Sequence, residues 1–211
     1  MVTGEDGVTD LAGGSISGPV TERASVRAII AANRGMYQIA RHWLAISNGL
    51  AALFALLPLA APLLLSAGAD RAAGAIDGAF WYLCHQRDDR SFHLAGERVA
   101  CCHRCLAIYG GLFLAGLAFT VVRTRVGPLR LPLASLLVTP VLVDVLTQPI
   151  FGRESAMVPR VVTGLLFALA VNWVALPRLD AGFAGIRAQI ETRFARLVAA
   201  GRVTPLPGTS R

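Results

Sequence analysis

Four long apolar segments restrict the fold of this chain more than any other feature. They comprise residues 44–65, 106–122, 131–151 and 158–176, and each holds between 17 and 22 residues. A helix of about 20 residues crosses the hydrocarbon core of a bilayer, which is about 30 Å thick. Pro132 and Pro159 fall in the expected first turns of two segments, where a missing N–H costs nothing. We therefore predict an all-α, polytopic membrane protein with four transmembrane helices.

The composition agrees with a membrane protein and argues against a nucleic-acid-binding protein. Hydrophobic residues make up 55% of the chain and charged residues 16%, whereas soluble domains average about 25% charged residues. The net charge is +7, and all 20 basic residues are arginine. A nucleic-acid surface needs such charges on one face beside stacking aromatic rings, but here they flank the apolar segments. We expect contact with a lipid bilayer and no nucleic acid.

The distribution of arginine predicts the orientation in the membrane. Four spans place both termini and the loop between the second and third spans on one side, which carries 13 of the 20 arginines. By the positive-inside rule this side is cytoplasmic, so residues 66–105 form an extracytoplasmic loop. Ala67, Gly68 and Ala69 resemble a signal-peptidase site. However, the 43 residues before the first apolar segment and the length of that segment are atypical of a signal peptide, so we expect no cleavage.

The two ends of the chain differ in composition from the membrane domain of residues 44–176. Residues 1–21 are rich in Gly, Ser, Thr and Asp, and we predict that they are disordered. Residues 22–43 and 177–211 show apolar side chains at helical spacing with arginines between them. Such basic amphipathic helices either lie on an anionic leaflet or pack against the membrane domain, and the sequence leaves both open.

Residues 84–105 contain all four cysteines and three of the four histidines. Cys102 and Cys105 have the C-x2-C spacing that presents two sulfurs to one tetrahedral Zn²⁺ ion. Cys84 and His85 complete a four-ligand set. Because neighbouring residues point in different directions, His93 or His103 is an alternative fourth ligand. The spacing therefore suggests a zinc site.

Two other interpretations of these cysteines stay open. Cys102 and Cys105 precede or begin a membrane helix, whose dipole lowers a thiol pKa, as do nearby Arg98 and Arg104. This arrangement fits a thiol-disulfide oxidoreductase that passes electrons to a quinone. Disulfides also persist outside the cytoplasm, so an inert bridge or a structural metal in a non-catalytic scaffold or subunit is the third possibility.

A second polar group lies around the third apolar segment. Asp144 is an ionisable residue inside a predicted span, and such residues are candidates for function. Gln148 shares its helix face, and Arg153 and Arg160 follow in the next loop and span. We treat these four as candidate catalytic residues, in which Asp144 is a general base on a zinc-bound water and an arginine holds an anionic substrate. The alternative is a purely structural pair of Asp144 with Arg160.

Two separated motifs carry a resemblance to a known family. They read Cys84-His85-Gln86, Arg90-Ser91-Phe92, Gly96, Cys102-x-Arg104-Cys105 and Ile108-Tyr109-x-Gly111 in the first block, and Asp144, Thr147-Gln148, Arg153-Glu154-Ser155, Arg160 and Thr163-Gly164 in the second. The sequence in this region resembles a family of small prokaryotic integral membrane proteins classified only as a domain of unknown function. The resemblance implies one joint site and brings no activity, substrate or oligomeric state.

Overall fold

The computed structural model describes residues 8–9, 15–16 and 20–200, with side chains from residue 28 to 200. The elements in chain order are β1 Val8–Thr9, β2 Ser15–Ile16, α1 Val20–Ser66, α2 Asp70–Trp81, the 3₁₀ helix η1 Asp88–Arg90, β3 Ser91–Leu94, β4 Glu97–Cys102, α3 His103–Val122, α4 Leu131–Phe151 and α5 Met157–Ala199. The chain forms two compact units, Leu44–Asp180 and Met1–Trp43 with Ala181–Arg211. We call the first the membrane unit and the second the terminal unit.

Four of the helices, α1, α3, α4 and α5, are long and apolar enough to cross a membrane. Only 17–28% of the most apolar stretch of each is buried, so their large apolar side chains face outward. Exposed apolar surface of this extent is stable against lipid and not against water. The all-α fold with four transmembrane helices is therefore confirmed, and α3 also takes in the turn His103–Cys105 that precedes the second apolar segment.

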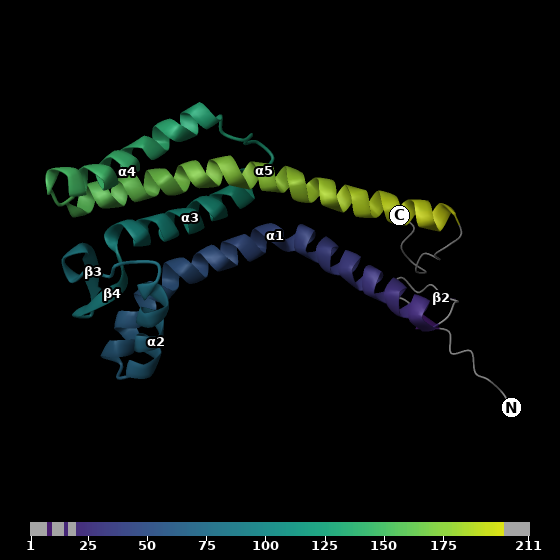
Figure 1. Ribbon diagram of the computed structural model, residues 1–211, viewed down its shortest axis with the longest axis horizontal. Helices are drawn as coiled ribbons and strands as arrows, with labels where there is room; N and C mark the ends of the chain where they lie inside the picture. Colours follow the sequence, from purple (N-terminus) through teal and green to yellow (C-terminus); the bar gives the residue numbers. More distant parts are fainter. Residues whose placement is uncertain (1–7, 10–14, 17–19, 201–211) are drawn as a thin grey trace. The chain divides into compact units, whose positions relative to one another are not determined.

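Small residues and buried amides join the helices of the membrane unit, in which α3, α4 and α5 lie side by side (Figure 1). A Cβ on Gly111 would meet Ala168 Cβ at 2.7 Å, so α3 and α5 approach closely there. The amide of Asn172 donates to Leu112 O at 2.9 Å, and that of Asn48 on α1 donates to Gly116 O at 3.2 Å. Close approach with interhelical hydrogen bonds is the usual way in which helices associate in lipid.

The predicted extracytoplasmic loop of residues 66–105 contains a helix and a hairpin. Helix α1 ends at Ser66 and is followed by Gly68, which has a φ of +76°, and the N–H of Ala69 donates to Leu64 O at 2.8 Å. This is a Schellman cap, in which glycine accepts the left-handed backbone most easily. The segment that resembles a signal-peptidase site is thus the C-terminal cap of α1. Helix α2 begins directly after it, with Asp70 in its first turn.

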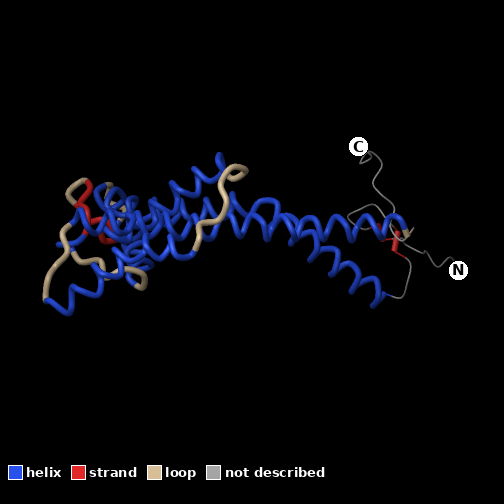
Figure 2. The backbone as a smooth tube through the Cα atoms, turned by 90° about the horizontal axis from the view of Figure 1, so that it is seen from above, coloured by secondary structure: helices blue, strands red, loops and turns tan. Residues whose placement is uncertain are grey.

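Strands β3 and β4 form the antiparallel hairpin that precedes α3, and they are drawn in red in Figure 2. Leu94 pairs with Glu97 across a two-residue turn in which Ala95 and Gly96 both have positive φ. Such a turn matches the natural twist of paired strands. At the other end of the hairpin Cys102 pairs with Ser91 and also caps α3. The hairpin therefore fixes where the C-x2-C segment enters the membrane helix.

In the terminal unit, the N-terminal part of α1 and the C-terminal part of α5 pack against each other. Trp43 stacks on Phe183 with ring centroids 5.3 Å apart, and Tyr37 Oη donates to Glu191 Oε1 at 3.0 Å. Ile186 and Ile190 are half-buried. The amphipathic segments of residues 22–43 and 177–211 thus continue the spans as helices as far as they are described. Strands β1 and β2 pair with each other, but most of residues 1–21, predicted to be disordered, lies outside the described residues.

Candidate functional site

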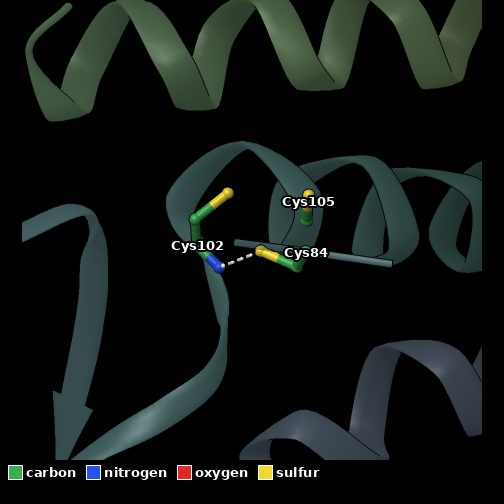
Figure 3. Close-up of side chains that lie close together, drawn as sticks. All are labelled: Cys84, Cys102 and Cys105. Carbon is green, nitrogen blue, oxygen red and sulfur yellow. Dashed lines mark hydrogen bonds between the residues drawn. The ribbon is translucent and has the colours of Figure 1, made fainter. Parts of the chain in front are cut away.

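Three cysteines from the loop after α2, from β4 and from α3 come together at one end of the membrane unit. Cys84 lies in the loop after α2, Cys102 ends β4, and Cys105 lies in the first turn of α3. Their Sγ atoms all lie within 4.8 Å of one another. Figure 3 shows the three side chains converging on the start of α3. We call these residues the cysteine cluster.

Gln86 holds the loop that carries Cys84. Its buried side-chain amide donates to Asp77 O at 2.8 Å and to Ala100 O at 2.9 Å, which ties the loop to α2 and β4. Its backbone has a φ of +47°, a conformation that non-glycine residues seldom adopt. Cys84 itself is tied to the end of α2, because its N–H donates a hydrogen bond to Phe80 O at 2.9 Å. The loop is therefore pinned on both sides of the sulfur.

Hydrogen-bond donors surround the sulfur of Cys84. The thiols of Cys101, Cys102 and Cys105, in that order of effect, hold the pKa of Cys84 far below its usual range. The backbone N–H of Cys102 also donates to this sulfur, at 3.2 Å. In turn, the bond to Cys84 and burial raise the pKa of Cys101 far above its usual range. The lowered pKa favours the thiolate form of Cys84, the form in which cysteine binds metals.

The cysteine cluster fits a tetrahedral metal ion. A Zn–S distance of about 2.3 Å places sulfurs on one ion about 3.8 Å apart, and the three Sγ atoms need to close by about 1 Å at most to reach this arrangement. The N–H donor from Cys102 to Cys84 Sγ fits a charged thiolate, because charge-assisted hydrogen bonds favour the anion. Three sulfur ligands leave one position of a tetrahedron open.

No histidine belongs to this group among the residues that the structure describes. His85 is exposed and lines a pocket next to the cysteines. The alternative ligands lie elsewhere, because His93 Nε2 is 3.0 Å from Asp88 Oδ1 and His103 packs on Phe92 with ring centroids 4.4 Å apart. Of the four predicted ligands, Cys84, Cys102 and Cys105 therefore come together and His85 stands beside them.

The pocket has a volume of about 310 Å³ and joins the two groups of residues that the sequence singles out. Its lining consists of Leu83, Cys84, His85, Arg87, Arg90, Cys102, Arg104, Cys105, Gln148 and Arg160. Gln148 of α4 and Arg160 of α5 thus line the same pocket as the three cysteines. The other two catalytic candidates, Asp144 and Arg153, are not part of this lining.

Asp144 pairs with arginines other than the one expected. One carboxylate oxygen accepts a hydrogen bond from Arg104 Nη2, and the other from Arg153 Nη2 at 3.0 Å. The structural ion pair that the sequence allows for Asp144 is therefore formed with Arg104 and Arg153, which occupy both oxygens, and not with Arg160. Arg104 extends its side chain from α3 to Asp144 on α4, while its backbone packs tightly on α5, where a Cβ on Gly164 would meet Arg104 O at 2.9 Å. Helix packing, which the sequence does not show, decides this pairing.

The 3₁₀ helix η1 is tied to the loop between α4 and α5. Arg90 pairs with Glu154 of that loop and lies 3.5 Å from Asp89 Oδ2, and Arg87 Nη2 lies 3.5 Å from Glu154 Oε1. Glu154 thereby raises the pKa of Arg90. Sequence reasoning did not assign Arg87, Arg90 or Arg104 to the site, although Arg90 and Arg104 belong to the motifs of the resemblance. Their place in those motifs was the available signal.

Fold and site together define a polytopic membrane protein with a thiol cluster at one end of its helices. Over residues 84–174 the chain matches a family described as "Predicted membrane protein (DUF2085)". It is 37% identical to an uncharacterised protein of Methanothermobacter thermautotrophicus over 86 residues, which are 41% of this chain and 78% of the relative. The chain belongs to this family of predicted membrane proteins, as the two motifs indicate.

A second relative matches over a smaller share of its length. An uncharacterised protein of Methanocaldococcus jannaschii is 32% identical over 98 residues, which are 45% of this chain and 62% of the relative. No solved structure matches the chain. The matched residues contain the cysteine cluster, Asp144 and Arg160, so the family likeness covers the site. It also covers all of α3 and α4 and most of the part of α5 that lies in the membrane unit.

Proposed function

We propose that this chain is an integral membrane protein that binds one zinc ion through Cys84, Cys102 and Cys105. The observation that supports the proposal is the mutual approach of the three Sγ atoms to within 4.8 Å. All four cysteines are free thiols in this structure, and the pKa of Cys84 is strongly lowered, so a thiolate is at hand. Sulfur-rich tetrahedral sites favour Zn²⁺ over the harder Mg²⁺ and Ca²⁺.

The open fourth position gives the proposed site a role beyond folding. It faces the pocket, where either His85 or a small molecule completes the shell. A zinc ion with an open position acts as a Lewis acid and lowers the pKa of bound water to about 7. Gln148 and Arg160 contact the ligand in the pocket, and Asp144 orients Arg104 and Arg153 instead of acting as a base.

A membrane thiol oxidoreductase is the second candidate, because Cys102 and Cys105 are free and close together. In this case the two thiols are oxidised to a disulfide, and a quinone accepts the two electrons and two protons. A scaffold with a purely structural metal is the third. The thiols serve as ligands in the first and third functions and cycle between oxidation states in the second.

Elemental analysis of the purified protein separates these functions. We expect about one Zn per chain without added metal, as for a single tetrahedral site. Cys84→Ser, Cys102→Ser and Cys105→Ser should each abolish zinc binding, and Cys101→Ser is the matched control that keeps it. Metal-free protein with Cys102 and Cys105 joined by a disulfide in non-reducing mass tagging would exclude zinc binding and support the oxidoreductase.

The same thiols report the orientation in the membrane. We propose that both termini are cytoplasmic and that the cysteine cluster faces outward, with exposed Arg193 and Arg196 contacting anionic lipid. A membrane-impermeant thiol reagent, applied to intact cells under reducing and chelating conditions, should label the wild type and not a cysteine-free variant. If the thiols are labelled only after the membranes are disrupted, the cysteine cluster faces the cytoplasm and the proposed orientation is wrong.

A further inference from the structure

The buried guanidinium of Arg160 has a charge that the structure does not balance. Arg160 lies in the first turn of α5 and is 5% exposed. Among residues 28–200, whose side chains are described, no carboxylate forms an ion pair with it, and its Nη2 has no hydrogen-bond partner. An isolated buried charge costs several kcal/mol, and more so next to lipid. A residue in this position needs an anionic partner.

Other donors in the same pocket are also unsatisfied. The Nε atoms of Arg90 and Arg104 are buried and, within the described part of the chain, form no hydrogen bond, although Arg90 Nε lies 3.5 Å from Asp89 Oδ2 in an ion pair. Both residues line the pocket with Arg160 and Gln148. A guanidinium group has five donors and no acceptor, so these arginines cannot satisfy one another. The pocket therefore needs a group that accepts several hydrogen bonds at once.

The charge count around the pocket points in the same direction. Five arginines, which we call the arginine cluster, meet three carboxylates. The arginines are Arg87, Arg90, Arg104, Arg153 and Arg160, and the carboxylates are Asp89, Asp144 and Glu154. Among these side chains two positive charges are in excess, and an ionised Cys84 lowers the excess to one. Three thiolates on one divalent ion would add a single negative charge, so an excess of one positive charge remains even when the metal is bound.

The geometry of the donors selects the kind of anion. Arg90, Arg104 and Arg160 come from η1, α3 and α5, so three guanidinium groups enter the pocket from different elements. Guanidinium forks suit carboxylate and phosphate alike, but three of them offer more donors than the two oxygens of one carboxylate accept in a plane. A tetrahedral phosphate presents oxygens in several directions. The volume of about 310 Å³ is at the lower end for small-molecule sites and leaves room for a group attached to the phosphate.

We propose that this pocket binds a phosphate group, held by Arg160 together with Arg90 and Arg104. The site uses side chains other than the cysteine cluster and does not depend on the metal. The phosphate belongs either to a soluble phosphomonoester or inorganic phosphate, or to the headgroup of an anionic lipid such as phosphatidic acid. The bare phosphate group is what these sources share.

Thermal denaturation of the purified full-length protein tests the site with two probes. Inorganic phosphate is added to protein in detergent, and nanodiscs of phosphatidylcholine with phosphatidic acid are compared with phosphatidylcholine alone. A rise in the midpoint with free phosphate indicates a soluble ligand, and a rise only with phosphatidic acid indicates a lipid headgroup. If neither probe raises the midpoint of the wild type, the proposal is wrong.

Arg160→Gln decides whether the response comes from this pocket. We expect it to weaken phosphate binding about tenfold or more, as for loss of a charge-assisted hydrogen bond. Because it removes an unbalanced buried charge, its midpoint without phosphate should equal or exceed that of the wild type, so loss of response is separable from loss of folding. Arg160→Lys should keep part of the response. Arg123→Gln is the control, because Arg123 pairs with Asp180 outside the pocket.

A cysteine variant separates this proposal from the zinc site. In Cys105→Ser, which should lack the metal, all arginines remain and the response to phosphate should persist. A response that disappears in Cys105→Ser but stays in Arg160→Gln would place the anion on the metal and overturn the arginine site. An equal response of Arg160→Gln and the wild type would overturn it as well.

Discussion

The cysteine cluster and the arginine cluster adjoin one pocket but are built in different ways. The cysteines come from 22 consecutive residues, 84–105, and one hairpin brings them together. The arginines come from η1, α3, the loop after α4, and α5, so helix packing has to assemble them. The chemistry of the first group suits a cation and that of the second an anion. The comparison shows that a local motif creates its site with few long-range contacts, whereas the second group depends on the whole membrane unit.

The variant expected to disturb the arginine cluster most is one that removes the Asp144 carboxylate, with which Arg104 and Arg153 pair. Asp144→Asn keeps the shape but leaves the half-buried Arg104, whose side chain is 17% exposed, without its charged partner. Removing one member of a buried pair costs about 3–5 kcal/mol, so we expect a large drop in the midpoint of thermal denaturation in detergent. The zinc content should stay the same, because Asp144 does not contact the cysteines.

The double variant Asp144→Asn, Arg104→Gln tests the assignment of the pair. It should recover part of the lost stability, because neither charge is then left alone. Asp144→Asn with Arg160→Gln should recover less. Equal or greater recovery with Arg160→Gln would contradict the ion pair seen here.

These two clusters also differ in how far the sequence predicts them. Cys102 and Cys105 are predicted as ligands from their C-x2-C spacing, and Cys84 from its place in the same 22-residue stretch; the structure brings the three together. The partner of Asp144 is not predictable in this way. Helical periodicity places Asp144 and Gln148 on one face of α4, but it does not say which neighbouring helix faces them. The close packing at Gly164 brings in Arg104, and it has no signature in a single sequence.

The fold, too, is predicted from the sequence only in part. The four spans follow from length and hydropathy, and their ends agree with the helices to within a few residues apart from the extensions of α1 and α5. Helix α2 and the β3–β4 hairpin were not predicted, because the cysteines and charges of residues 66–105 obscure any regular apolar pattern. The Ala95-Gly96 turn was the local signal for the hairpin.

Removing the metal should destabilise the cysteine cluster and spare the arginine cluster. If zinc is present at 100 times its dissociation constant, chelation costs about 3 kcal/mol of stability. We expect a chelator to lower the denaturation midpoint of the wild type and of Cys101→Ser. Cys102→Ser, which should not hold zinc, is the control whose midpoint stays constant. A chelator effect of the same size in Cys102→Ser would show that the ion binds elsewhere.

A methyl group at Gly164 tests how strongly the arginine cluster depends on helix packing. A Cβ there would lie 2.9 Å from Arg104 O and 3.0 Å from Ala107 Cβ, so α3 and α5 have to separate. Overpacking of this kind costs about 1–3 kcal/mol. Gly110→Ala is the matched control on α3, because a Cβ at Gly110 would meet nothing within 4 Å and alanine favours the helix. Gly164→Ala should lower the midpoint, whereas Gly110→Ala should leave it unchanged or raise it.

Arg153→Gln should have the smallest effect, and it tests whether the two arginines on Asp144 are equivalent. The Arg153 side chain is 45% exposed, so water screens its 3.0 Å ion pair with Asp144 Oδ1. Exposed pairs of this kind contribute up to about 1 kcal/mol, and Arg104 still neutralises the carboxylate. We expect a small drop in the denaturation midpoint, well below that of Asp144→Asn, and an unchanged response to phosphate because Arg153 does not line the pocket. A drop as large as that of Asp144→Asn would mean that Arg153, and not Arg104, supplies the main partner of the intramembrane carboxylate.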